Sequence, residues 1–132
     1  MLMVCPMISN NPFNIRFVKQ NCWRGQIGKT SSGFCRFSTL YYGCRAFAVL
    51  FKNFIKRGYT VADFINRYAP PSENHTNVYI SYVCSQLDCE PAYKLVESDF
   101  VDFAFAVASV ESSVAVAHHI MPILSQLYCK YF

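Results

Sequence analysis

No acidic residue precedes Asp63, and all eight Asp and Glu side chains lie from that position onward. Charge is scarce overall, because only 15% of the 132 residues are charged, against about a quarter in typical soluble domains. Nine of the twelve Lys and Arg lie before Asp63, so the N-terminal half should present a basic face. Such a face suits an anionic polymer, either nucleic acid or bacterial wall glycan with its acidic stems. A dispersed, solvated set of charges is the alternative.

Closely spaced metal-ligand pairs are also lacking. The seven cysteines form no CxxC or CxxH motif, so zinc binding has little support, and we expect neither a metal nor a cofactor. Their odd number favours free, buried thiols, with one or two disulfides after export as the open alternative. The adjacent residues His118 and His119 would point about 100° apart on a helix, which excludes joint ligation in the i, i+4 manner.

The chain lacks an uninterrupted apolar run of membrane-spanning length. Asp102, Glu111 and Pro122 break the longest candidate, at residues 100–124. Residues 1–9 lack the basic and apolar regions of a signal peptide. We therefore expect no membrane span and synthesis in the cytoplasm, so that action at a cell wall would need delivery by a virion or a secretion device.

Helical periodicity dominates what is present. We expect a single mainly α (α+β) domain over residues 1–132, made of an N-terminal extension (1–10), a loop and β-hairpin (11–37) and a helical part (38–132). The Gly- and Ser-rich turn within residues 23–37 predicts the hairpin. Apolar spacing and capping residues predict helices over about 40–57, just after Thr60, and over about 77–87, 98–110 and 117–130. In the helix at 77–87, we expect Val78, Tyr82 and Val83 to share one side.

Glu111 is the most unusual acid in the chain, because it interrupts a long apolar run. On a helix it follows Phe100, Ala104 and Val107 along one stripe that should face the core. Burial would raise the pKa of its carboxyl, and a carboxyl that keeps its proton near neutral pH can serve as a general acid. The alternative is a partly exposed Glu at a frayed helix end, or one paired with an Arg.

A second candidate acid is Glu73, which follows the stiff Pro70-Pro71 pair and is itself followed by Asn74. The positive end of the next helix favours an anion at this position. The alternative is that Glu73 or Asn74 caps that helix.

An aromatic and amide set in the N-terminal part is typical of sugar binding, since aromatic faces stack on sugar rings and amides bind hydroxyl groups. Its members are Asn14, Arg16, Trp23, Gln26 and Phe37. The alternative is that Trp23, the only tryptophan, belongs to the core.

Five short segments resemble a family of phage virion or structural proteins found in phages and prophages. In that family they are Asn-Pro-Gly-Asn-Ile-Arg, Trp-x-Gly-Gln, Gly-Phe-x-x-Phe, Gly-x-Arg-Ala and Ala-Pro-x-x-Glu-Asn-x-Thr-x-x-Tyr. Here the corresponding segments begin at Asn11, Trp23, Gly33, Gly43 and Ala69. The family ends with a helix carrying Glu-Asn-Gly, where this chain has Glu111-Ser-Ser; Phe13 also replaces a family glycine.

The order of these segments looks like a circularly permuted lysozyme or lytic transglycosylase, with the Glu helix last instead of first. Residues 68–83 are similar to the aromatic segment that floors the cleft of those enzymes, which would place Asn74 and Tyr79 at the substrate. The resemblance implies cleavage of peptidoglycan glycan strands, with Glu111 as general acid. Glu73 would then act as a base for water or stabilise the oxocarbenium ion. The alternative is a non-catalytic virion or tail protein that binds wall glycan or a neighbouring subunit, and a nucleic-acid-binding module is a weaker third candidate.

Overall fold

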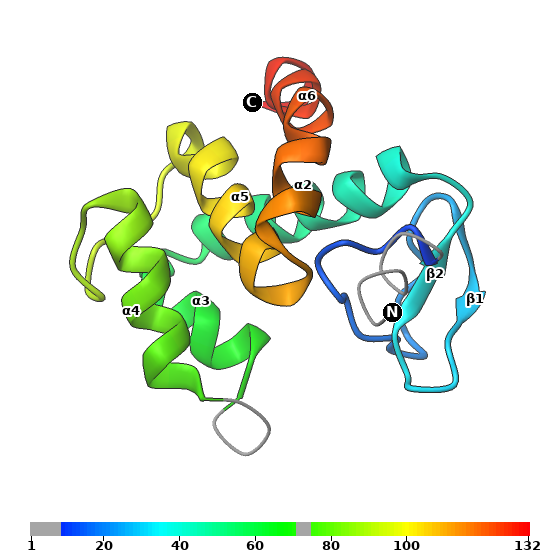
Figure 1. Ribbon diagram of the computed structural model, residues 1–132, viewed down its shortest axis with the longest axis horizontal. Helices are drawn as coiled ribbons and strands as arrows, with labels where there is room; N and C mark the ends of the chain where they lie inside the picture. The colour runs from blue at the N-terminus through cyan, green and yellow to red at the C-terminus, as the bar shows by residue number, and fades with distance from the viewer. Residues whose placement is uncertain (1–8, 71–74) are drawn as a thin grey trace.

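The computed structural model describes residues 9–70 and 75–132, and it is mainly helical with a small antiparallel hairpin near the N-terminus. The elements in chain order are β1 (Gln26–Lys29), β2 (Cys35–Phe37), α2 (Leu40–Lys56), α3 (Val61–Tyr68), α4 (Thr76–Leu87), the short 3-10 helix η1 (Glu97–Asp99), α5 (Phe100–Glu111) and α6 (Val114–Tyr131). Figure 1 shows the hairpin at one side of the molecule, α3 and α4 at the other, and α5 and α6 between them. The predicted mainly α class with an N-terminal hairpin is confirmed.

The hairpin has one face on the core. Strands β1 and β2 pair antiparallel, with Gln26 opposite Phe37 and Lys29 opposite Cys35. Cys35 and Phe37 are buried, whereas Arg36 between them is exposed, which is the alternation of a strand covered on one side. The predicted hairpin is therefore present, and its inward residues belong to the core.

Helix α2 packs against the loop that precedes the hairpin, residues 10–25, which we call the N-terminal loop. It begins after Thr39, whose Oγ1 accepts a hydrogen bond of 3.3 Å from the backbone N–H of Tyr42. The ring of Phe13 stacks on that of Phe47, with centroids 4.1 Å apart. Gly43 allows the backbone of Asn10 to lie directly against the helix, because a Cβ at Gly43 would stand only 1.9 Å from the Asn10 carbonyl oxygen. The loop before the hairpin is thus seated on α2.

Helix α4 packs on α3 and α5. The residues that it buries agree only in part with those predicted from the sequence. Val83 is fully buried but Val78 is 70% exposed, so the two do not share one side and the prediction for Val78 was wrong. The buried side carries Tyr79 and Ile80 instead. Because a helix turns about 100° per residue, shifting the buried stripe by one residue moves Val78 to solvent and brings Tyr79 inward.

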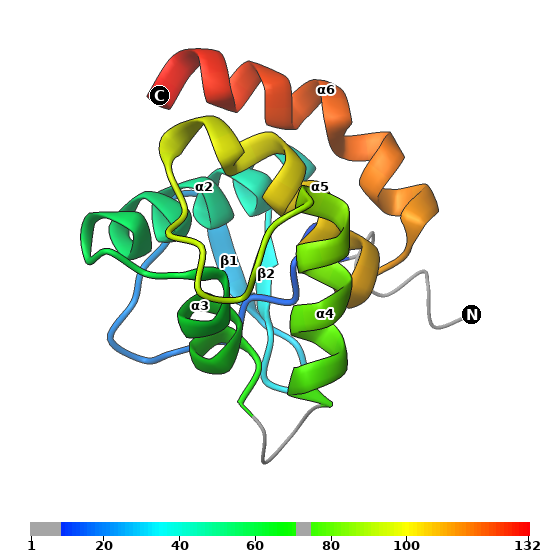
Figure 2. The ribbon, with the colours of Figure 1, turned by 90° about the vertical axis from the view of Figure 1, so that its left-hand side faces the viewer.

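Helices α5 and α6 cover the molecule from one side, and Figure 2 shows α6 lying across the top of α2 and α5. α6 begins at Val114, three residues before the predicted start, because the Ser113 Oγ accepts a hydrogen bond of 3.1 Å from the backbone N–H of Val116. Pro122 lies inside this helix. None of the helices in residues 9–70 and 75–132 combines the length and hydrophobicity that crossing a bilayer requires.

The cysteines of the described residues are all free thiols. Three are buried, at Cys35, Cys44 and Cys84, whereas Cys22 and Cys129 are exposed and Cys89 is half-buried. Cys5 lies outside the described residues. The expected burial therefore holds for three of the six described cysteines.

Candidate functional site

Glu111 is the last residue of α5, and the predicted stripe leads to it. Phe100, Ala104 and Val107 are all fully buried, and the Glu111 side chain is half-buried just beyond them. The carboxyl therefore stands where the apolar face of the helix ends, as the periodicity predicts.

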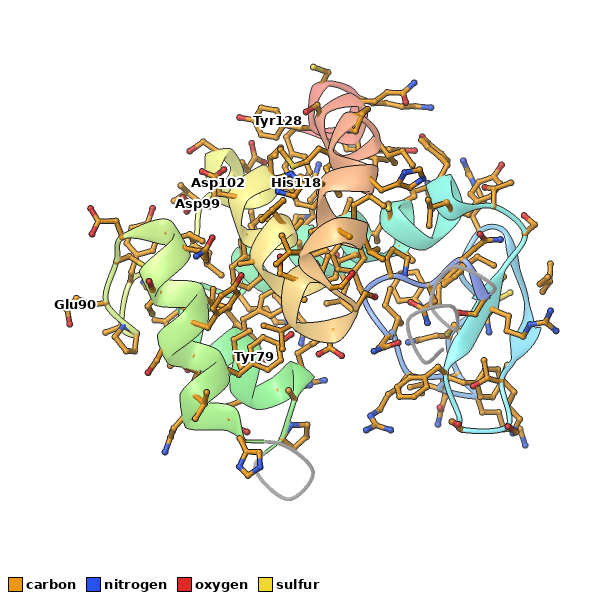
Figure 3. The ribbon with its side chains drawn as sticks, in the orientation of Figure 1. Tyr79, Glu90, Asp99, Asp102, His118 and Tyr128 are labelled. Carbon is orange, nitrogen blue, oxygen red and sulfur yellow. The ribbon has the colours of Figure 1, made fainter. Side chains whose placement is uncertain are left out.

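Both carboxylate oxygens of Glu111 accept hydrogen bonds from distant parts of the chain. Asn14 Nδ2 donates to Oε1 over 3.1 Å and also to the Glu111 backbone carbonyl over 2.8 Å. The Tyr79 hydroxyl donates to Oε2 over 2.9 Å. Figure 3 shows Tyr79 on the side of α4 that faces the middle of the molecule. Three segments, the N-terminal loop, α4 and the end of α5, thus meet at one carboxyl group.

The N-terminal loop holds Asn14 in place through its own buried amide network. Asn11 is fully buried, and its side-chain oxygen accepts a hydrogen bond of 2.9 Å from the backbone N–H of Ile15. The Asn11 amide group also donates to the carbonyl of Cys35 in β2 over 3.0 Å. Asn14 itself has a left-handed φ of 52°, a conformation that Asn tolerates better than most residues. This conformation is part of the geometry that places its side chain beside Glu111.

Two further hydrogen bonds fasten the loop to the helices around Glu111. The Tyr68 hydroxyl, at the end of α3, donates to the Phe13 carbonyl. The Ser112 hydroxyl, directly after Glu111, donates to the Pro12 carbonyl over 2.7 Å. The geometry around the carboxyl is therefore fixed from several sides.

Burial has the largest effect on the pKa of the Glu111 carboxyl. Burial raises the pKa of its carboxyl, while the hydrogen bonds from Tyr79 and Asn14 and the charge of Arg16 lower it; the net pKa shift is upward. Burial, together with the charge of Glu111, raises the pKa of Tyr68 and of Tyr79 well above the usual range of a phenol. Both phenols are therefore neutral donors at physiological pH, and Glu111 holds its proton to a higher pH than an exposed Glu.

A pocket of about 350 Å³ adjoins this carboxyl network, and we call it the Trp23 pocket. Its lining includes Asn14, Arg16, Trp23, Arg57, Arg67 and Tyr68. Asn14 belongs to both the carboxyl network and the pocket, because its amide binds Glu111 and the same residue lines the pocket. The pocket lies between the N-terminal loop and helices α2 and α3.

The structure brings some of the predicted sugar-binding residues together and separates others. Asn14, Arg16 and Trp23 all line the Trp23 pocket. Trp23 is half-buried. It packs against the core, which is one of the two alternatives for this residue, and it also lines the pocket, which the sugar-binding alternative requires. Gln26 supports it from β1, because the Gln26 side-chain oxygen accepts a hydrogen bond of 3.1 Å from the backbone N–H of Trp23. Phe37 is only 1% exposed, so its ring is core and offers no face to a sugar.

The remaining predicted residues fall into two groups. Tyr79 is buried and binds Glu111 directly, instead of presenting a face to substrate. Glu73 and Asn74 lie outside the described residues. The Arg45 guanidinium donates to the Tyr131 hydroxyl over 3.0 Å, and the charge that acts on the pKa of Glu111 is that of Arg16.

Sequence reasoning did not assign Arg57 and Arg67 to the site, and it included Tyr68 only as the first residue of the segment 68–83 that resembles the floor of a cleft. Arg57 reads in sequence as a cation at the negative end of α2, and Tyr68 as an inward-facing helix residue. Nothing in local spacing indicates that these residues share a wall with Asn14, since the pocket forms only when α2 and α3 pack beside the loop. Among residues 9–70 and 75–132, no three His, Cys, Asp or Glu side chains gather in a way that could hold a metal ion.

Comparison with protein-family models and with curated protein sequences finds no match for this chain.

Proposed function

We propose that this chain cleaves peptidoglycan glycan strands, as a muramidase or lytic transglycosylase, and that Glu111 is its general acid. One observation carries the proposal: a half-buried carboxyl with a raised pKa shares Asn14 with a pocket that contains the only tryptophan. Shifted acids beside a pocket are common features of catalytic sites. The resemblance to phage virion proteins supports a phage or prophage origin and delivery to the wall by a virion or secretion device.

In the proposed reaction, Glu111 transfers its proton to the glycosidic oxygen as the bond from that oxygen to the anomeric carbon breaks. The sugar left behind carries positive charge, and water in a muramidase, or one of its own hydroxyl groups in a lytic transglycosylase, adds to it. The attacking hydroxyl group gives its proton to a carboxylate, either Glu73 or the ionised Glu111. Glu73 is the proposed second carboxylate, as a base for that water or as a stabiliser of the cation. Tyr79 is a positioning residue, because its hydroxyl orients the carboxyl without reaching the pocket.

Substrate would occupy the Trp23 pocket, whose lining does not include Glu111 but does include its hydrogen-bond partner Asn14. Trp23 supplies an aromatic surface and Arg16 supplies donors for sugar hydroxyls and carboxylates. Asn14 offers its side-chain oxygen as an acceptor, because both of its amide hydrogens are donated to Glu111. Gln26 keeps the backbone of Trp23 in place, and Asn74 is expected at the substrate from the resemblance alone. The expected partner is therefore a peptidoglycan glycan strand.

A second candidate function has its own observation. Both Glu111 oxygens are bound within the protein, and they join three segments that are far apart in the sequence. A carboxyl used in this way can serve stability alone, as in a non-catalytic virion or tail protein that binds wall glycan or a neighbouring subunit. The two functions differ in whether Glu111 gives its proton to a substrate.

Incubation with purified peptidoglycan, followed by mass spectrometry of the released muropeptides, separates the two. We expect the wild type to release muropeptides and Glu111→Gln to lose about 100-fold or more of that rate, because general acid catalysis contributes about that factor. Asp102→Asn is the matched control, since Asp102 is an exposed acid on the same helix. Undiminished release by Glu111→Gln, or no release by a folded wild type, would overturn the enzymatic proposal and leave the non-catalytic one.

A further inference from the structure

The charged residues in the lining of the Trp23 pocket all have one sign. Arg16, Arg57 and Arg67 contribute to its wall, and no Asp or Glu among the described residues does. They come from three separate segments: the N-terminal loop, the end of α2 and the last turn of α3. A concave site with one sign of charge raises the local concentration of ligands with the opposite sign.

Arg67 is held on the wall by aromatic neighbours. Its guanidinium lies over the ring of Phe54, with the central carbon 5.7 Å from the ring centroid. Its Nη1 donates to the Tyr59 hydroxyl over 3.4 Å. Because a guanidinium has five N–H donors, these contacts orient the group and leave donors for a ligand. Arg57 follows the last residue of α2, directly beside the same wall.

The uncharged part of the lining suits a sugar. The amides of Asn21 and Asn53 supply hydrogen-bonding groups, and the indole ring of Trp23 supplies an aromatic surface, within the same 350 Å³. The indole N–H itself is buried and has no hydrogen-bond partner among the described residues. That volume is at the lower end of about 300–1,000 Å³ for small-molecule pockets, so it accommodates a short part of a polymer and not a long stretch.

We propose that the Trp23 pocket is a subsite for a carboxylate-bearing sugar, in which Arg57 and Arg67 bind a carboxylate of the glycan strand that Glu111 cleaves. This inference rests on the proposed function and adds the substrate class to it: an acidic glycan, not a neutral one. Planar guanidinium groups bind carboxylates through paired, charge-assisted hydrogen bonds, which fix orientation as well as adding affinity. In peptidoglycan the carboxylate comes either from the lactyl ether of the muramyl sugar or from the stem peptide attached to it.

Binding is measurable apart from cleavage, because Trp23 is the only tryptophan and lines the pocket. Its fluorescence is titrated in the Glu111→Gln background, so that no ligand is consumed. The probes are a peptide-free muramyl tetrasaccharide, the same tetrasaccharide with its stem peptides, chitotetraose as the neutral matched glycan, and a short single-stranded oligonucleotide. Where Glu111→Gln does not fold, the wild type is titrated with thio-linked, uncleavable versions of the same glycans.

We expect the muramyl tetrasaccharide to bind at least about 10-fold more tightly than chitotetraose, since hydrogen bonds to charged groups contribute more than that factor. A peptide-free ligand that binds well assigns the carboxylate to the lactyl group, whereas a requirement for the stem peptide assigns it to the peptide; both support an anionic subsite. Equal binding of the acidic and neutral glycans overturns the proposal. Tighter binding of the oligonucleotide than of either acidic glycan also overturns it.

The arginines are tested by Arg57→Gln combined with Arg67→Gln, which should reduce binding of the muramyl tetrasaccharide to the level of chitotetraose. Arg36→Gln combined with Lys130→Gln is the control, because it removes the same charge from exposed positions that do not line the pocket. An unchanged affinity in the first double variant overturns the subsite.

If that variant releases muropeptides from peptidoglycan at the wild-type rate, the subsite fails while the proposed function stands. If the wild type binds acidic glycans selectively but releases nothing, the proposed function fails while the subsite stands.

Discussion

The Tyr79 hydroxyl donates a hydrogen bond of 2.9 Å to Oε2 of Glu111, across 32 positions of sequence. The bond joins the buried face of α4 to the last residue of α5. Because burial and the nearby carboxyl keep the pKa of Tyr79 far above neutral, the phenol remains a donor at any physiological pH. The bond therefore orients one oxygen of the carboxyl, while Asn14 binds the other.

Replacing Tyr79 with Phe removes this donor and leaves the ring in place. We expect a loss of about 1–3 kcal/mol in the free energy of unfolding, because the hydrogen bond is made to an ionisable group. The pKa of Glu111 should rise further, since the Tyr79 bond lowers it. Urea unfolding and a ¹³C NMR titration of the carboxyl measure the two effects. Tyr82→Phe on the same helix is the control, and an unchanged Glu111 pKa in Tyr79→Phe would contradict the assigned bond.

Asn14 combines a side-chain role with a backbone role, and two substitutions separate them. Asn14→Gly keeps the left-handed backbone and removes the amide that binds Glu111 twice, so we expect a loss of about 1–3 kcal/mol in unfolding free energy. Asn14→Ala should cost about 1–2 kcal/mol more, because a Cβ is strained at a φ of 52°. Denaturant unfolding of both variants gives the comparison. Finding Asn14→Ala more stable than Asn14→Gly would be inconsistent with the left-handed conformation.

The raised pKa of Glu111 predicts how stability depends on pH. Above the ordinary value of 4.5 and up to its raised pKa, the folded state holds a proton that the unfolded state has lost. The contribution of this group to stability is thus complete below 4.5 and is lost as the pH rises through the folded pKa. Glu111→Gln does not titrate, so its melting temperature relative to wild type should increase over that window. Thermal melts followed by circular dichroism measure it, and a relative melting temperature that falls with pH would mean that the pKa is lowered instead.

Gly43 should resist replacement although it lies in a helix. Gly→Ala inside a helix usually stabilises by about 1 kcal/mol. Here the added Cβ would meet the Asn10 carbonyl oxygen at 1.9 Å, and that oxygen is backbone that cannot rotate away. We therefore expect Gly43→Ala to destabilise by about 1–3 kcal/mol, as overpacking does. Denaturant unfolding measures the change in the free energy of unfolding. Lys56→Ala, at an exposed position of the same helix, is the control. A Gly43→Ala variant more stable than wild type would show that the N-terminal loop does not pack against α2.

Local signals predicted much of the fold. The capping box at α3 forms as its sequence indicates, with Thr60 and Asp63 exchanging two hydrogen bonds of 3.0 Å. The prediction for Val78 was wrong because short helices with apolar residues on several sides have no unique inward face until their neighbours are in place. Phe37 likewise became core because the hairpin turns its inner face toward α2, and strand alternation alone does not say which face that is.

The sequence by itself determined that Glu111 would end an apolar helical stripe, because the period of a helix is a local property of the backbone. It also determined the hairpin and the basic character of the N-terminal half, since turn residues and charges are visible without a fold. Only the tertiary structure decided that Asn14 and Tyr79 would bind Glu111, from 97 and 32 positions away. The arginine lining of the Trp23 pocket was decided in the same way. Such contacts depend on how helices and loops pack together, and packing is set by the shape of the whole core instead of by any one segment.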